Sequence, residues 1–252
     1  MLYLIGLGLS DEKDISLRGL EALKGSERVY FESYTGFFNG DLGRLEALCG
    51  RKIKALSRGD VEEHPEENVL KNALQGTVSL LVLGDPMVAT THVDLLLRAR
   101  KKGIRTIVIH ASSVYSAVAE TGLQIYKFGR TTTIAYPEGS YFPTSPYDAL
   151  GENRERGLHT LCLLDVKAAE GRYMTVNEAI GLLLRMESEK REGRFSGSTP
   201  CVGVARLGGD STIKYGPVIK LLEADFGRPP HVLIVPGKLH YMEEEALKAF
   251  SD

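Results

Sequence analysis

Three short segments with chemical potential each follow an apolar run. They are Gly-Leu-Gly-Leu at residues 6–9, Gly-Asp-Pro at 84–86 and Ala-Ser-Ser at 111–113. If the apolar runs are neighbouring parallel strands, their carboxyl ends meet at one edge of a sheet. Ligands of open α/β sheets bind beyond that edge. We therefore expect the three segments to form one binding crevice, with Asp85 as its acid.

Asp85 also has a simpler interpretation. An aspartate directly before a proline is a helix-start signature, because the carboxylate caps free backbone N–H groups and proline fits the first helical position. From the sequence alone, Asp85 could be either a structural helix cap or an acid that binds a ligand.

The residue types around this crevice favour a cationic ligand with a ribose. The first segment continues as GLGLSD, which lacks the third glycine of a dinucleotide fingerprint, and Asp11 would repel a phosphate. Glu32 ends the second expected strand, where a nicotinamide enzyme would bind ribose, so that alternative stays open. No Lys or Arg lies in these loops. S-adenosylmethionine, with its sulfonium, ammonium and ribose, suits such a crevice.

The first half of the chain is predicted to alternate strands with helices. Continuously apolar strands followed by helices are typical of a parallel sheet covered on both faces. Strands are expected at 2–6, 29–32, 52–56, 77–84 and 103–110, and helices at 16–25, over LEAL, around 69–74 and at 93–103.

The second half changes character, which predicts a mixed sheet. Residues 136–147 hold three prolines and four aromatics without periodicity and are expected to form an ordered loop. Thr175 and Glu178 form a capping box before a helix over 175–190. Further strands are expected at 131–136, 158–166, 201–207 and 231–237. We place the boundary near Ser112 and expect two α/β domains, 1–111 and 112–252.

Composition is that of a soluble globular protein. The 252 residues carry a net charge of −2, which requires neither a nucleic-acid partner nor an anionic membrane surface. The three cysteines are widely spaced, so reduced thiols in the cytoplasm are the simplest interpretation. No apolar stretch approaches the roughly 20 residues that span a bilayer.

Several longer segments resemble one family. LVLGDPMVATTH and the start LYLIGLGLSDEKDISLRGLEAL are similar to the tetrapyrrole methylase-like class. IYKFGRTTTIAYPEGSYFPTSPYD, ERGLHTLCLLDVKA, YMTVNEA and PPHVLIVPGKLH resemble archaeal diphthine synthases in particular. The resemblance covers essentially the whole chain. Residues 6–9 lack the Pro-Gly step common in tetrapyrrole methylases, which argues against a tetrapyrrole substrate.

The resemblance implies a fold, a reaction and partners. The fold is tetrapyrrole methylase-like, with a mostly parallel N-terminal sheet, a mixed C-terminal sheet and a cofactor cleft between the domains. The reaction is successive N-methylation of the 3-amino-3-carboxypropyl group of a modified histidine on translation elongation factor 2. S-adenosyl-L-methionine is the methyl donor, S-adenosyl-L-homocysteine the product, no metal is needed, and the enzyme is a homodimer.

The family's cofactor contacts carry over to eight positions. They are Leu9, Asp85, Val88, Ser113, Val114, Leu164, Leu207 and His231. No catalytic residue is assigned, although His92, His110 and His231 are chemically able to act as a base. The aromatic loop 136–147 is expected to receive the elongation factor, unless its aromatics are buried in the protein's own core.

Three other functions remain open on the sequence. One is methyl transfer to a corrin or uroporphyrin, because those methylases have similar Gly-Asp-Pro segments. Another is a nicotinamide oxidoreductase, which depends on Glu32 and the α/β pattern. The last is an α/β binding module without catalytic activity.

Overall fold

The computed structural model describes residues 1–251 and divides into two compact units. The first unit is Met1–Tyr115 and the second begins at Ser116. Each unit has a sheet and a hydrophobic core of its own.

The sheet of the first unit has five strands in the order β3-β2-β4-β1-β5, and all its pairings are parallel. Parallel strands run with their carboxyl ends toward one edge, and that edge carries the candidate site. The strands are β1 (Leu2–Gly6), β2 (Arg28–Glu32), β3 (Ile53–Leu56), β4 (Val78–Val82) and β5 (Thr106–Ile109).

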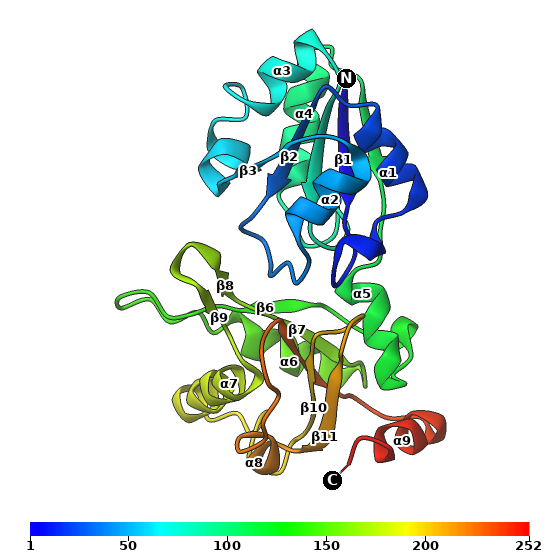
Figure 1. Cartoon of the computed structure of the whole chain (residues 1–252). Helices are drawn as coiled ribbons and strands as arrows, with labels where there is room; N and C mark the ends of the chain where they lie inside the picture. Colours follow the sequence, from blue (N-terminus) through cyan, green and yellow to red (C-terminus); the bar gives the residue numbers. More distant parts are fainter. Residues whose placement is uncertain (252) are drawn as a thin grey trace. The chain divides into compact units, whose positions relative to one another are not determined.

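Two helices cover each face of this sheet (Figure 1). Side chains of α1 (Leu17–Lys24) and α2 (Leu42–Cys49) share a core with Ile5, Phe31 and Leu81. Side chains of α3 (Val69–Gln75) and α4 (His92–Lys101) share the other core with Leu4 and Leu80. Successive residues of a strand point to opposite faces, so strands buried on both sides must be apolar throughout. The unbroken apolar runs of the sequence have this cause.

The second unit has a mixed five-stranded sheet in the order β11-β10-β12-β7-β6. Only the β6–β7 pairing is parallel among these strands. The strands are β6 (Thr132–Ile134), β7 (Thr160–Leu164), β10 (Pro200–Ala205), β11 (Thr212–Pro217) and β12 (His231–Val235), and β8 (Val166–Lys167) pairs with β9 (Arg172–Tyr173) as a separate ribbon. The predicted pair of parallel and mixed sheets is confirmed.

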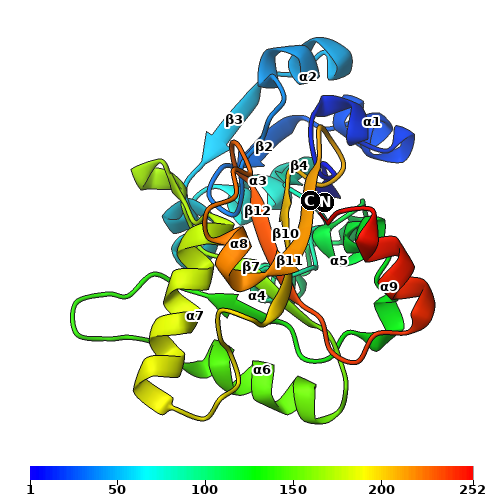
Figure 2. The same ribbon diagram turned by 90° about the horizontal axis from the view of Figure 1, so that it is seen from below.

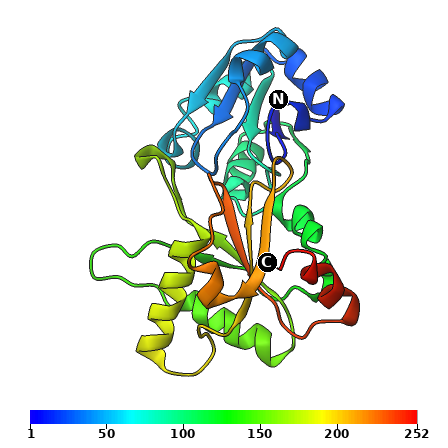
Figure 3. The ribbon, with the colours of Figure 1, turned by 60° about the horizontal axis from the view of Figure 1, so that its bottom comes forward.

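Three helices of the second unit pack into one core against its sheet (Figures 2 and 3). They are α6 (Ser145–Glu155), α7 (Val176–Lys190) and α8 (Val218–Leu221), while α5 (Val114–Ala117) and α9 (Tyr241–Lys248) lie outside that core. The capping box is present, since Thr175 accepts from the Glu178 N–H and Glu178 accepts from the Thr175 N–H. The short helical turns are Glu12–Asp14, Gly59–Glu63, Val118–Thr121, Ile125–Lys127 and Ala168–Glu170.

The helices α6, α8 and α9 and the strands β9 and β11 were not predicted, and α6 includes residues 145–147 of the segment predicted as a loop. The α6 segment SPYDALGENRE contains a glycine and an asparagine and has no clear apolar stripe, because its buried face includes Gly151 and Asn153. The sequence pattern likewise gave no indication of α9 and β11. Among residues 1–251, no helix is long and apolar enough to span a bilayer, and no group of three or more His, Cys, Asp or Glu side chains could hold a metal ion.

Candidate functional site

Three loops interlock at the carboxyl edge of the first sheet, as predicted. Gly8 and Gly84 exchange two backbone hydrogen bonds, of 3.3 Å and 2.8 Å, and both have φ values in the left-handed region. A Cβ atom on Gly6 would lie 2.6 Å from both the Ala111 Cβ and the Gly84 carbonyl oxygen. Gly6 must therefore be a glycine because a Cβ atom would clash, and Gly8 and Gly84 must be glycines because of their positive φ. The three loops form a backbone-lined surface at this edge.

Asp85 is buried, and its hydrogen bonds shape its own loop and tie it to the loop after β5. Its side chain is 6% exposed. Oδ1 accepts from the Met87 N–H at 2.9 Å, and Oδ2 accepts from the Ala111 N–H at 3.2 Å and from the His110 Nδ1–H at 2.8 Å. The Oδ1 bond closes a turn rather than capping a helix, because α4 begins only at His92. The prediction that Gly-Asp-Pro starts a helix is therefore wrong.

A buried histidine–glutamate pair, His92 and Glu32, lies next to the Gly-Asp-Pro turn. The Nδ1 of His92 lies 2.9 Å from the Pro86 carbonyl, which only accepts, so Nδ1 carries a hydrogen. The Nε2 lies 3.1 Å from Glu32 Oε2, an ion-pair contact that is too poorly aligned for a hydrogen bond. Burial alone would lower the pKa of His92, but the Glu32 carboxylate outweighs it and raises that pKa. The contact between His92 and Glu32 thus fastens the turn to the end of β2.

The surroundings of Glu32 remove the support for a nicotinamide cofactor. The residue is fully buried, and its Oε1 accepts from the N–H and the hydroxyl of Thr35. Its other oxygen faces His92. A ribose-binding acid must present an oxygen to the ligand, and Glu32 presents neither of its oxygens.

The remaining predicted residues of the first unit flank these loops. Leu9 is half-buried, and its loop is held by Asp14, whose Oδ2 accepts from the N–H groups of Leu9 and Ser10 at 3.2 Å and 2.7 Å. Val88 is also half-buried, and the next residue, Ala89, has a φ of 54°. A positive φ outside glycine costs free energy and is concentrated at functional sites.

Ser113 and Val114 follow the end of β5. Ser113 is 7% exposed, and Val114 begins the short helix α5. A Cβ atom built on Gly84 would lie 4.0 Å from the Ser113 Cβ, so Ser113 reaches the Gly-Asp-Pro turn. The structure therefore brings five predicted cofactor contacts to one edge of the first unit: Leu9, Asp85, Val88, Ser113 and Val114.

The other three predicted contacts gather at one edge of the second sheet. Leu164 ends β7, His231 begins β12, and Leu207 comes two residues after the end of β10. The register pairs Ala205 with His231 and Leu163 with Val232, so these strand ends are neighbours. Leu164 and Leu207 are 9% and 7% exposed, which makes this edge largely apolar.

His231 is engaged through both ring nitrogens. Its Nδ1 accepts from the Val176 N–H at 3.3 Å, and its Nε2 donates to the carbonyls of Gly227 and Arg228 at 3.1 Å and 3.2 Å. The ring is therefore neutral in this arrangement, and burial, aided by the nearby Arg206 cation, lowers the pKa of His231. Its visible role is to hold the segment before β12.

Arg206 organises the loop that precedes Leu207. Its φ is 55°, and its guanidinium donates to the carbonyls of Asp210, Phe226 and Arg228 and to the Thr212 hydroxyl. Like Ala89, Arg206 has an unfavourable positive φ and lies next to a residue predicted to contact the cofactor.

The aromatic loop does not have the exposed surface that its composition suggested. Tyr136 and Tyr147 are 5% and 0% exposed and belong to the core of the second unit. Phe142 packs against that core, with the Arg185 guanidinium 4.0 Å from the ring centroid. Only Tyr141, at 68%, is exposed among the four aromatics. The alternative of burial in the protein's own core explains three of them.

Sequence reasoning missed the residues that hold the loops in place. Asp14 binds backbone N–H groups four and five residues before it, whereas Arg206 and the His92–Glu32 pair bind partners 20 to 60 residues away. An acid at a strand end or a lone arginine in a loop has no distinctive spacing. The single usable signal was Glu32, a charged residue within an otherwise apolar strand.

The chain matches one family model over most of its length. The family model of the tetrapyrrole (corrin/porphyrin) methylases matches residues 1–218. The chain therefore belongs to the tetrapyrrole methylase family.

Within that family, relatives at high coverage are diphthine synthases. The enzyme of Methanocaldococcus jannaschii is 49% identical over 252 residues, and that of Methanococcus maripaludis is 45% identical over 250 residues; both comparisons cover 98% of each chain. A crystal structure of diphthine synthase superposes with a TM-score of 0.90 at 37% identity, covering 100% of this chain and 96% of the other. The predicted resemblance is confirmed.

Proposed function

We propose that this protein is an S-adenosylmethionine-dependent methyltransferase that acts as a diphthine synthase. It successively methylates the amine of the 3-amino-3-carboxypropyl-histidine on translation elongation factor 2, a step of diphthamide biosynthesis. The observation that carries the proposal is similarity at 49% identity over nearly the whole chain to a diphthine synthase.

The loops of the first unit fit the proposed cofactor. S-adenosyl-L-methionine is cationic at its sulfonium and its ammonium, and its ribose needs polar partners. The edge supplies backbone groups of the glycine loops and the buried Asp85 carboxylate, and its three loops contain no Lys or Arg. When bound, the cofactor supplies an electrophilic methyl group.

We assign the cofactor to both groups of predicted contacts. Leu9, Asp85, Val88, Ser113 and Val114 would hold it from the N-terminal domain, and Leu164, Leu207 and His231 from the C-terminal domain. The apolar character of Leu164 and Leu207 suits an adenine ring. Asp85 acts chiefly by fixing the loops, because its bonds to Met87, His110 and Ala111 occupy both oxygens.

The proposal extends to the setting of the enzyme. We place it in the cytoplasm as a homodimer, with residues 1–111 and 112–252 as its two domains. Its net charge of −2 gives no reason to add a nucleic-acid partner.

Binding calorimetry and a methyl-transfer assay test the proposal. We expect S-adenosyl-L-homocysteine to bind with one site per chain and NAD to give no heat. The purified protein should transfer methyl groups to elongation factor 2 that carries the unmethylated histidine modification. Methyl transfer to uroporphyrinogen III but not to the elongation factor would favour a tetrapyrrole methyltransferase. Binding of NAD but not of S-adenosyl-L-homocysteine would favour an oxidoreductase. Binding of S-adenosyl-L-homocysteine without methyl transfer to any substrate would indicate a binding module.

A further inference from the structure

The three candidate bases, His92, His110 and His231, differ in which ring nitrogens are free. Both nitrogens of His92 face partners, the Pro86 carbonyl and Glu32. Both nitrogens of His231 make hydrogen bonds to backbone groups. A proton acceptor needs an unoccupied lone pair that substrate can reach, so neither ring qualifies as it stands.

His110 has the arrangement that the other two lack. Its side chain is 69% exposed, and its Nδ1 lies 2.8 Å from Asp85 Oδ2. No residue among 1–251 hydrogen-bonds to its Nε2. Asp85 already accepts from the backbone N–H groups of Met87 and Ala111, so its side chain is held as an acceptor facing His110. The His110 hydrogen therefore lies on Nδ1, and the lone pair of Nε2 points away from Asp85.

The pair differs from an ordinary surface ion pair. Its carboxylate is 6% exposed and is fixed by the Met87 and Ala111 N–H groups, so the imidazole has one preferred orientation. A buried acid that orients the Nδ1–H of a histidine is the arrangement that holds a catalytic imidazole in its basic tautomer. The pair also lies at the end of β5, directly beside the interlocked loops.

We propose that His110 is the general base that deprotonates the substrate amine, with Asp85 as its positioning residue; this rests on the proposed function. An alkyl amine is mostly an ammonium at neutral pH and has no lone pair to donate. The Nε2 of His110 forms a bond to one ammonium proton, and the broken N–H bond leaves its electron pair on the amine nitrogen. The resulting imidazolium is stabilised by the Asp85 carboxylate. Each later round of methylation needs the same step, because the methylated product is again an ammonium.

The decisive variant is His110→Asn, compared with wild type and with His64→Asn. An asparagine can still donate a hydrogen bond toward Asp85 but cannot accept the proton. His64 is an exposed histidine of the same unit whose ring makes no hydrogen bond among residues 1–251, so it controls for loss of a histidine. We expect His110→Asn to bind S-adenosyl-L-homocysteine within about twofold of wild type. Its kcat for methyl transfer should fall by at least about 100-fold, the usual contribution of a general base, and His64→Asn should match wild type.

A spectroscopic measurement tests the tautomer without any activity. Nitrogen-15 NMR of the histidine rings, with the product bound and free, should show His110 protonated on Nδ1 and bare on Nε2. The Asp85→Asn variant should shift His110 toward the other tautomer and lower kcat more than it raises KM.

Three outcomes would overturn the proposal while leaving the proposed function intact. They are full methyl transfer by His110→Asn, loss of product binding in that variant, and an Nε2–H tautomer in the wild type. A wild-type enzyme that transfers no methyl group would instead refute the proposed function itself.

Discussion

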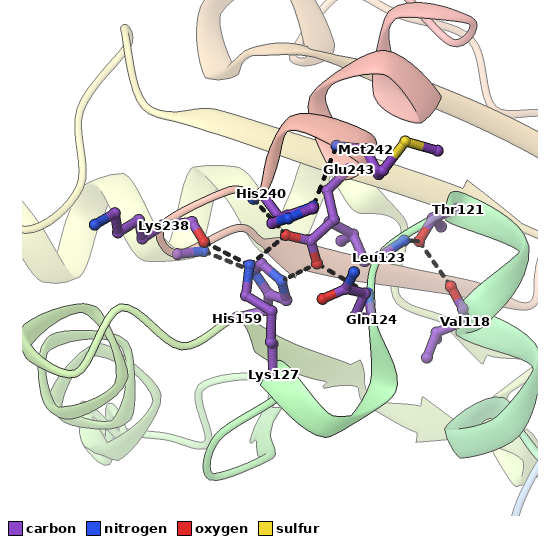
Figure 4. A network of polar contacts seen from close by, with 11 residues as sticks. Val118, Thr121, Leu123, Gln124, Lys127, His159, Lys238, His240, Met242 and Glu243 are labelled. Carbon is purple, nitrogen blue, oxygen red and sulfur yellow. Dashed lines mark hydrogen bonds and ion pairs between the residues drawn. The ribbon is translucent and has the colours of Figure 1, made fainter.

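Glu243 offers the sharpest test of how this structure is held together (Figure 4). The carboxylate is fully buried. Its Oε1 accepts from the Gln124 N–H at 2.9 Å and from the His159 Nε2–H at 2.9 Å. Its Oε2 accepts from the His240 N–H at 2.8 Å and from the Lys127 ammonium. One side chain of α9 thus binds the N–H of its own N-cap residue, His240, and three donors from two other segments of the second unit.

The magnitude follows from the pKa of Glu243. Burial alone would raise that pKa, but the four donors, with Lys127 foremost, outweigh burial and lower it to about 2. An ordinary glutamate titrates near 4.5. Each tenfold change in proton affinity is about 1.4 kcal/mol, so the ionised carboxylate contributes about 3 kcal/mol of stability at neutral pH. Because the folded pKa is the lower one, this stability is complete above about pH 4.5 and is lost as the pH falls toward 2.

We therefore expect Glu243→Gln to lower the free energy of unfolding by about 3 kcal/mol at pH 7. The amide has one oxygen where the carboxylate has two, and its NH₂ group meets N–H donors. Between pH 7 and pH 3 the wild type should lose about 2 kcal/mol more than the variant does.

Urea unfolding followed by circular dichroism at pH 7 and pH 3 measures both quantities. Glu245→Gln is the matched control on the same helix, because Glu245 is 64% exposed in its pair with Lys248 and should contribute less than about 0.5 kcal/mol. If Glu243→Gln and wild type lose equal stability on acidification, the buried network does not hold a carboxylate in its ionised form.

Three further predictions concern the loops and the second unit. Gly6→Ala should abolish binding of S-adenosyl-L-homocysteine in calorimetry, because the new Cβ would lie 2.6 Å from the Gly84 carbonyl; Gly181→Ala, in open space on α7, should leave binding unchanged. Phe142→Ser should lower the free energy of unfolding by about 1–2 kcal/mol, because the ring packs on the core, whereas the exposed Tyr141→Ser should change it by less than about 0.5 kcal/mol. If Tyr141→Ser instead slows methyl transfer to elongation factor 2 with stability intact, the loop docks that partner. Thr175→Ala should cost about 1 kcal/mol in urea unfolding through loss of the capping box, and an unchanged midpoint would show that α7 is held by its packing alone.

The sequence by itself determined the features that depend on neighbours along the chain. Mostly apolar runs such as that of β4, in which Ser79 is the one polar residue, indicated a sheet covered on both faces. Thr175 and Glu178, three residues apart, predicted the start of α7, and the loop glycines marked the edge where the candidate site lies. These signals are local, because side-chain periodicity and capping act within a few residues.

Only the tertiary structure decided what each polar side chain does. The sequence offered His92, His110 and His231 as equivalent bases and Glu32 as a ribose ligand. Burial and pairing then separated them, since His92 and Glu32 face each other in the interior and His110 keeps one nitrogen free beside Asp85. The partners of these residues lie 25 to 60 residues apart in the chain. Burial, pairing and protonation depend on what the fold brings within about 3 Å, and no pattern along the chain records that distance.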